Sequence, residues 1–383
     1  MPLKRSVRGQ VPPFIVMDVL REANLREAAG GDVLHLEVGQ PSTPAPSAVI
    51  AAAQRALVSD KLGYTEALGI EPLRARIAAH YREAYGIDLD PARVVVTTGS
   101  SGGFMLAFLS AFDAGDRIAL ADPGYPAYRN FLIALGIEPV GIPTTAADRY
   151  QPTPALLDRI AGKIDGLIVA SPANPTGTML SSGEMEALAA YCRDRGIRLI
   201  SDEIYHGITY TMPGTTALRF TDDAFVINSF SKYFSMTGWR IGWMVIPEDL
   251  GRSVECLAQN LFISVPALSQ LAASAAFDCR GELDANVARY AANRDLLLRE
   301  LPKAGIDRLA PADGAFYIYA DVAHLTNDSE TFCRELLADT GVAIAPGTDF
   351  DKERGRSTVR ISFAGATETM AEAARRLGAW IAR

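Results

Sequence analysis

Apolar residues along this chain recur at two spacings, and the two alternate. Between residues 47 and 85 an apolar side chain recurs at about every fourth position, as on an amphipathic helix, first at Val49, Ala53 and Leu57 and then at Leu73, Ile77 and Tyr81. Short, continuously apolar runs rich in β-branched residues follow, at 93–98, 117–122, 166–171, 197–202 and 224–230. Such runs are typical of parallel strands, because helices cover both faces of a parallel sheet. The pattern predicts an α/β fold with a mostly parallel sheet between helices.

Near residue 280 the alternation of helical patterns with short apolar runs ends, which predicts a second, smaller α+β domain. A charged helix, two strands and a closing helix are predicted there, at 285–305, 315–322, 357–364 and from about Thr367. The N-terminal segment has few helix signals and several prolines, so we expect it to lie across another surface. The predicted parts are an N-terminal arm that joins the small domain (1–45), a large ligand-binding domain (46–280) and a small C-terminal domain (281–383).

Composition and charge narrow the classes of function. The chain has 383 residues, of which 49% are hydrophobic and 21% charged, so it is an ordinary globular sequence with material for two domains. Its net charge of −8, without a basic tail, argues against binding to nucleic acids or anionic membranes. The four cysteines are widely spaced, and the sequence has neither a signal-peptide pattern nor a bilayer-length apolar run. We therefore expect a cytoplasmic protein with reduced thiols, and its scattered histidines predict no metal site.

Several predicted strands end in small or polar residues, which would share one edge of the sheet. Ligands of open α/β sheets bind beyond that edge. The stretch TTGSSGGF (97–104) joins a strand to a helix, so its backbone N–H groups are suited to a phosphate. It matches neither the dinucleotide fingerprint nor the P-loop, and a tight structural turn is an equal alternative. Asp202 ends another strand, where it would either cap a helix or pair with a cation.

The stretch NSFSKYFSMTGWRIGW (228–243) places Lys232 directly after an apolar strand, although a lysine is ordinarily a solvated surface residue. A desolvated lysine near other cations has a lowered pKa and becomes a nucleophile towards carbonyl groups. The neighbouring serines and Arg240 are suited to a phosphate. A carbonyl-reactive lysine, a phosphate cup and the buried Asp202 together match what pyridoxal phosphate needs.

With these motifs in order along essentially its whole length, the chain resembles the class I/II aminotransferases, the aspartate-aminotransferase-like enzymes of PLP fold type I. The resemblance implies a PLP-dependent aminotransferase that moves an amino group from an L-amino acid to a 2-oxo acid by a ping-pong mechanism. Lys232 would form the Schiff base with the cofactor and carry the substrate's α-proton. Asp202 would pair with the pyridine nitrogen. The other implied cofactor contacts come from Ser100, Ser101, Tyr125, Asn174, Tyr205, Ser229, Ser231 and Arg240.

Three further motifs carry the resemblance to the substrate side. YTEALGIEPLR (64–74) resembles the segment whose tyrosine reaches the phosphate of the neighbouring subunit, so Tyr64 implies a homodimer with shared active sites. VGQP (38–41) resembles the loop that closes over substrate, with Gly39 near the substrate carboxylate. Arg360, in TVRISFA, is similar to the arginine that grips that carboxylate, although its position alone would also allow a surface residue on a strand.

The substrate is less well determined than the cofactor. Ser101 stands where some aspartate-using relatives carry a lysine, and no second arginine is assignable to a distal carboxylate, which favours a small, apolar or aromatic donor. A C–S β-lyase, or another enzyme on the same scaffold, is the alternative, because the cofactor site would be shared. A DNA-binding regulator is disfavoured because only about forty residues precede the first predicted helix. A nucleotide-binding oxidoreductase is disfavoured by the missing fingerprint.

Overall fold

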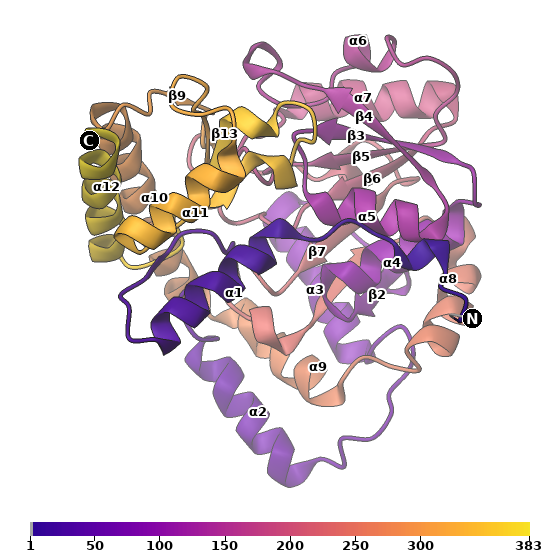
Figure 1. Cartoon of the computed structure of the whole chain (residues 1–383). Helices are drawn as coiled ribbons and strands as arrows, with labels where there is room; N and C mark the ends of the chain where they lie inside the picture. The colour runs from indigo at the N-terminus through magenta and orange to yellow at the C-terminus, as the bar shows by residue number, and fades with distance from the viewer. Residues whose placement is uncertain (1–2) are drawn as a thin grey trace.

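The computed structural model describes residues 3–383, and its largest element is a seven-stranded sheet (Figure 1). Along the sheet the strands are β2 (Val94–Thr97), β8 (Gly242–Val245), β7 (Phe225–Ser229), β6 (Arg198–Asp202), β5 (Gly166–Ala170), β3 (Arg117–Asp122) and β4 (Glu138–Pro143). Strand β8 runs antiparallel to both of its neighbours, whereas β7, β6, β5, β3 and β4 pair in parallel. The predicted α/β fold with a mostly parallel sheet is confirmed.

Helices cover both faces of this sheet, which explains why its strands are continuously apolar. Neighbouring residues of β2 belong to opposite cores: Val94 and Val96 join one, and Val95 joins the other. The first core includes residues of α2 (Ser47–Ser59), α3 (Glu71–Tyr85), α7 (Ser182–Arg195) and α9 (Ala267–Ala273). The second includes residues of α4 (Gly99–Ala111), α5 (Pro126–Leu135) and α8 (Gly251–Leu261). We call this assembly, with the short helix α6 (Pro154–Leu157), the sheet lobe.

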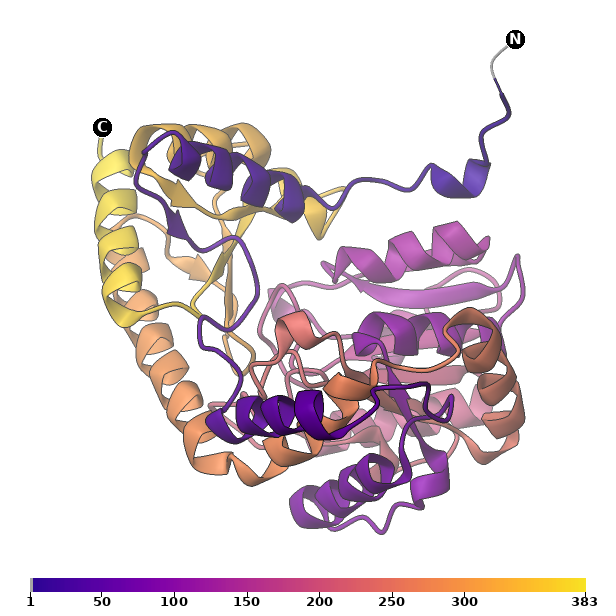
Figure 2. The ribbon, with the colours of Figure 1, turned by 90° about the horizontal axis from the view of Figure 1, so that it is seen from below.

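A second body, here called the C-terminal lobe, is built around a four-stranded antiparallel sheet. Its strand order is β12 (Ala345–Pro346), β13 (Thr358–Ser362), β10 (Tyr317–Asp321) and β9 (Arg308–Leu309). The helices of this lobe are α10 (Arg280–Lys303), α11 (Ser329–Thr340) and α12 (Thr367–Ile381). The N-terminal segment also reaches this lobe, since β1 (Leu34–His35) pairs with β11 (Val342–Ala343) and α1 (Ile15–Ala28) contacts β12. Figure 2 shows α1, in indigo, against the yellow C-terminal elements.

The structure differs from the sequence-based expectations at a few elements. Helix α1 was not predicted, and it buries little of its own surface, chiefly at Val16 and Ala23. Strand β4 escaped prediction because it is an edge strand of sequence EPVGIP, with two prolines that a central strand would not tolerate. Leu57 lies on the predicted apolar stripe of α2 but is exposed. None of the helices within residues 3–383 is both long and apolar enough to cross a bilayer.

Candidate active site

A cavity of about 470 Å³ lies where the carboxyl ends of the parallel strands meet the C-terminal lobe, and it collects most of the predicted site residues. The sheet lobe supplies its floor, while the N-terminal segment and β10 and β13 supply side chains from above. The predicted residues that line it are Gly39, Ser100, Ser101, Tyr125, Asn174, Asp202, Tyr205, Ser231, Lys232, Arg240 and Arg360. Residues more than 300 positions apart in the chain therefore face one space.

Lys232 follows β7 in the turn that leads to β8, and its amine points into this cavity. Its Nζ donates a hydrogen bond to the carbonyl oxygen of Gly39 at 2.6 Å. Burial and, to a smaller extent, the positive charges of Arg360 and Arg240 lower the pKa of Lys232 to about 8, while the negative charge of Asp202 opposes the shift. Gly39 must be a glycine here, because a Cβ would overlap the hydroxyl group of Tyr317.

Asp202 is the last residue of β6 and is almost fully buried. Its Oδ1 accepts a hydrogen bond from the backbone N–H of Ile204 at 3.1 Å, and its Oδ2 accepts one from the hydroxyl group of Tyr128. Burial raises the pKa of Asp202 to about 6, and the bond from Tyr128 opposes that rise. The chain after Asp202 forms a turn and not a helix, so the helix-cap alternative is wrong.

One end of the cavity is suited to an anion. Ser100 and Ser101 lie in the first turn of α4, whose N-cap residue Thr98 makes no side-chain capping bond, so this helix end keeps free N–H donors. Gly99 has a φ of +69°, and a Cβ placed on it would lie 2.6 Å from Nη2 of Arg240. The guanidinium group therefore packs directly against the glycine turn, and both face the same end of the cavity.

Arg360 lies on β13 at the opposite side and is 1% exposed, so the surface alternative is wrong. Its Nη1 donates to Oδ1 of Asn174 at 2.9 Å, and its Nη2 donates to the carbonyl oxygen of Glu37. The guanidinium carbon lies 4.5 Å from the ring centre of Tyr317 and 4.7 Å from that of Phe350. Its Nε has no hydrogen-bond partner within the described part of the chain. A buried donor without a partner is suited to a ligand oxygen.

Two predicted residues do not line the cavity. The hydroxyl group of Ser229 is buried behind it and donates to Oγ of Ser231 at 2.9 Å, so Ser229 supports a lining serine. Tyr64 lies in the connection between α2 and α3 and is 83% exposed. Within a single chain, Tyr64 therefore contributes nothing to the cavity.

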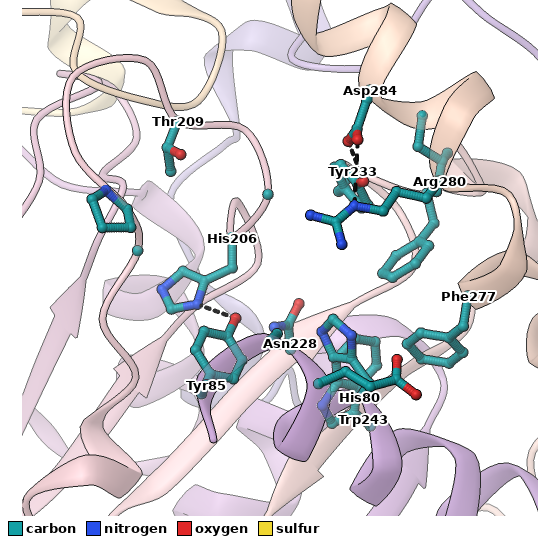
Figure 3. Close-up of a pocket in the computed structure, with 17 residues that line it drawn as sticks. His80, Tyr85, His206, Thr209, Asn228, Tyr233, Trp243, Phe277, Arg280 and Asp284 are labelled. Carbon is teal, nitrogen blue, oxygen red and sulfur yellow. Dashed lines mark hydrogen bonds and ion pairs between the residues drawn. The ribbon is translucent and has the colours of Figure 1, made fainter. Parts of the chain in front are cut away.

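A second cavity, of about 380 Å³, is lined by Tyr233 and His206 among others (Figure 3). Figure 3 shows His206 bonded to Tyr85, with Nδ1 and the hydroxyl oxygen 2.7 Å apart. Tyr233 donates to Oδ1 of Asp284 at 2.7 Å. The lining of this second cavity includes none of the predicted cofactor or substrate residues. However, His206 directly follows Tyr205 in the sequence, and Tyr233 directly follows Lys232. These two hydrogen-bonded pairs therefore lie directly next to Tyr205 and Lys232 in the chain.

Comparison with known proteins agrees with this geometry. Residues 31–377 match the family model for aminotransferase class I and II. The chain is 55% identical over 380 residues to a valine–pyruvate aminotransferase of Mycobacterium tuberculosis, covering 98% of both chains. The chain belongs to the class I and II aminotransferases. The resemblance inferred from the sequence motifs is therefore confirmed.

Solved structures of aminotransferases have the same fold over their whole length. The crystal structure of an aminotransferase from Mycobacterium tuberculosis has a TM-score of 0.98 at 54% identity, with all of both chains covered. The aspartate aminotransferase of Thermus thermophilus with maleate has a TM-score of 0.93 at 29% identity, covering 99% of this chain and 100% of that one. Like the other members of its family, this aminotransferase uses pyridoxal phosphate and moves an amino group from an amino acid to a 2-oxo acid.

The residues of the cavity fit this cofactor. The glycine turn of α4 with Arg240 forms a cradle that a single Cβ would fill, as expected for a close approach of backbone to phosphate. The buried carboxyl group of Asp202 lies at the end of a strand, where a protonated ring nitrogen would compensate its burial. The unpartnered Nε of Arg360 and the second N–H groups of its Nη1 and Nη2 leave donors free for a substrate carboxylate.

The cavity is also lined by residues that the sequence did not reveal. Tyr128 donates a hydrogen bond to Asp202. The hydroxyl oxygens of Tyr317 and Tyr205 are hydrogen-bonded to each other at 2.7 Å. Thr237, which lines the anion end, donates to the carbonyl oxygen of Ser231. Tyr128 could have been found because it lies one helical turn after Tyr125 in DPGYPAY. Tyr317 could not, since it occupies an ordinary core position of a predicted strand.

Proposed function

We propose that this aminotransferase takes an amino acid with a small or branched apolar side chain as donor and pyruvate or a similarly small 2-oxo acid as acceptor. The observation that carries the proposal is an apolar wall on the substrate side of the cavity, formed by Phe14, Met17, Leu20 and Val38. The cationic residues among the described lining side chains are Lys232, Arg240 and Arg360, each of which already has a place in the site. A distal carboxylate would find no further partner there. The name of the valine–pyruvate relative supports the same donor and acceptor.

Each residue that would contact the cofactor has a chemical role. Pyridoxal phosphate, when bound, supplies an electron-withdrawing ring that makes the substrate's α-proton acidic. Lys232 would be the nucleophile towards the cofactor's aldehyde and would carry the substrate's α-proton. Asp202 would keep the ring nitrogen protonated, Tyr205 and Asn174 would bond the phenolic oxygen, and Tyr125 would pack on the ring.

The phosphate and the substrate would be held at opposite ends of the cavity. Ser100, Ser101, Ser231 and Arg240 would bind the phosphate, and Ser229 would orient Ser231 through the hydrogen bond that it donates to Ser231. Arg360 grips the substrate α-carboxylate through its guanidinium fork, with the backbone of Gly39 alongside. The two grips fix the direction of the substrate, so its side chain meets the apolar wall. The donor leaves as a 2-oxo acid before the acceptor enters, which is a ping-pong sequence.

The homodimer and its location also belong to the proposal. Large apolar side chains are exposed along the end of α2, the connection after it and the end of α8: Leu57, Val58, Tyr64, Leu261, Phe262 and Ile263. A second copy of the chain that covers them would bring Tyr64 to its neighbour's phosphate, which makes the active sites shared. The four cysteines lie within the described residues and are free, which supports a cytoplasmic location.

We further propose the division into an N-terminal arm (1–45), a cofactor-binding domain (46–280) and a small domain (281–383). Residues 1–2 of the arm lie outside the described part of the chain. The pairing of β1 with β11 and the contact of α1 with β12 support the assignment of the arm to the small domain. Closure of the small domain over substrate would exclude water from the site.

A panel of amino donors against pyruvate and 2-oxoglutarate tests this proposal. Valine, leucine and alanine should give the highest kcat/KM, and aspartate should fall at least about tenfold below them, because its distal carboxylate would be buried unpaired. Each donor alone should convert the bound cofactor to pyridoxamine phosphate, as followed by absorbance. A preference for aspartate would overturn the donor class. Release of pyruvate and ammonia from β-substituted amino acids, without that conversion, would favour the C–S β-lyase alternative.

A further inference from the structure

The side chain of Asp349 lies at the start of α1, although the two are far apart in sequence. Its Oδ1 accepts a hydrogen bond from the backbone N–H of Ile15 at 3.1 Å, and its Oδ2 accepts one from that of Val16, also at 3.1 Å. Asp349 is 3% exposed. The N-cap residue of the helix, Phe14, has no side-chain acceptor to offer. A remote carboxylate therefore caps α1.

The capped end of α1 is the part that faces the active site. Phe14, Met17 and Leu20 lie on one face of the helix and line the apolar wall of the cavity. The ring of Phe14 meets the ring of Tyr125 edge to face, with centroids 5.8 Å apart. Asp349 itself is not among the lining residues.

The segment that carries Asp349 is anchored to the other groups of the site. The ring of Phe350 packs against the guanidinium group of Arg360. The backbone carbonyl oxygen of Phe350 accepts a hydrogen bond from the N–H of Gly124 at 3.0 Å. The carbonyl oxygen of Asp349 accepts a weaker bond from Arg129 at 3.3 Å. One short segment thus contacts the start of α1, the proposed carboxylate grip and the residue before Tyr125.

Capping by a carboxylate has two consequences for α1. It satisfies two N–H groups that would otherwise lack partners, and it places a negative charge at the positive end of the helix dipole. Because α1 buries few of its own side chains, its position depends more on this cap than the position of a well-buried helix would. The cap fixes the start of the helix, where the wall residues lie.

From this geometry we propose that Asp349 is a positioning residue for donor specificity: by capping α1 it holds the apolar wall at the distance that a branched side chain needs. The inference rests on the proposed donor class. It deepens that proposal by assigning the donor preference to a residue that contacts neither substrate nor cofactor. A donor with little side chain, such as alanine, gains little from the wall and depends little on Asp349.

The test compares Asp349→Asn with the wild-type holoenzyme. Asparagine has the same shape but loses the charge, and it can accept through one oxygen only. Asp328→Asn is the matched control, because Asp328 caps α11 in the same lobe by accepting from Thr331 N–H, away from the cavity. The readouts are kcat and KM for valine and alanine, cofactor absorbance, and hydrogen exchange of the amides at the start of α1.

We expect the ratio of kcat/KM for valine to that for alanine to fall about fivefold in Asp349→Asn, chiefly through KM, and to stay unchanged in Asp328→Asn. Amide exchange at the start of α1 should accelerate by about the same factor, with cofactor absorbance unchanged. The ratio does not depend on the fraction of active enzyme, so partial misfolding does not obscure it.

If kcat/KM fell equally for valine and alanine, or did not fall at all, the ratio would stay unchanged. Either result would overturn the assignment of donor preference to Asp349. Unchanged exchange at α1 would overturn the capping role itself. The exchange measurement does not involve any donor, so it separates a failure of this inference from a failure of the proposed donor class. If wild-type enzyme prefers aspartate to valine, the donor class and the specificity role fall together, whatever the exchange result.

Discussion

The amine of Lys232 has one hydrogen-bond acceptor, the carbonyl oxygen of Gly39, and it faces the positive charges of Arg360 and Arg240. A carbonyl acceptor holds the amine in place without supplying the negative charge that would stabilise its protonated form fully. Burial and the two cations outweigh the opposing charge of Asp202. The environment therefore makes the uncharged amine available at a pH much closer to neutrality than it is for an ordinary lysine.

This balance predicts a pH dependence. A pKa of about 8 means that the uptake of pyridoxal phosphate by cofactor-free enzyme accelerates with rising pH and levels off above about pH 8, well below the ordinary lysine value of 10.5. Arg360→Leu removes a positive charge, which favours the protonated amine, so the pKa rises and the plateau moves to higher pH. Stopped-flow absorbance measures the rate. The exposed Arg356 provides the control substitution, Arg356→Leu, and a plateau that both variants share with wild type would contradict this account.

Replacing the lysine tests the site most directly. Lys232→Ala should abolish turnover and the visible absorbance of the bound cofactor, because no other amine lines the cavity within residues 3–383. The fold should persist, since the side chain makes a single hydrogen bond. Circular dichroism and absorbance titration measure these outcomes, with Lys303→Ala on the exposed end of α10 as control. Wild-type turnover in Lys232→Ala would refute the assignment of the site.

At the scale of elements, the first turn of α4 depends on a residue without a side chain. Gly99→Ala should weaken cofactor binding at least about tenfold, because φ is positive there and the new Cβ would push Arg240 away. Gly183→Ala is the matched control in the first turn of α7, where a Cβ would meet nothing within 4 Å. That substitution should leave cofactor affinity unchanged and stabilise the fold by up to about 1 kcal/mol. Equilibrium titration with pyridoxal phosphate measures the cofactor affinity of the two variants. Equal affinities would contradict the proposal that the glycine turn and Arg240 form a phosphate cradle.

Much of the fold could be predicted because its strands are buried on both faces and carry a strong local signal. The predicted strands at 117–122 and 197–202 match β3 and β6 closely. Helix α1 could not be predicted, since its cap is Asp349, more than 300 residues away, and no local pattern records such a contact. Strand β4 was hidden by its prolines.

The site shows the same division between local and distant signals. Lys232, Asp202 and Arg240 belong to short motifs with unusual residues for their positions, so the sequence points to them. Tyr317 reaches the cavity through the pairing of β10 with β13, which no single stretch of sequence encodes. A sequence pattern can indicate a functional residue whose type is unusual at its position. It cannot indicate a residue such as Tyr317, whose type is common in the core of a strand.

At the scale of the whole molecule, the exposed apolar residues of α2 and its following connection predict the state of assembly. The enzyme should elute and scatter light at twice its chain mass of 41.1 kDa. Val58→Asp, at a position that is 91% exposed, should dissociate the dimer because it places a charge in the proposed interface. Cofactor affinity should fall with it, since Tyr64 would be lost from the neighbouring site.

The control for this prediction lies elsewhere on the surface. Leu25→Asp changes another exposed apolar residue, on α1, and should leave the dimer intact. Light scattering with in-line chromatography measures both variants. A wild-type enzyme that stays monomeric at micromolar concentration would remove Tyr64 from the proposed site.

The reversed strand β8 has a consequence for how the site assembles. Because β8 runs antiparallel to β7 and Ser229 pairs with Gly242, residues 230–241 form one closed connection that holds both Lys232 and Arg240. Closing so short a loop has a modest entropic cost, so the two groups can meet through local pairing. Gly39 and Arg360 must arrive from the two ends of the chain. During folding, Lys232, the proposed nucleophile, and Arg240, the proposed phosphate ligand, are therefore expected to be in place before Arg360 forms the proposed grip on the substrate.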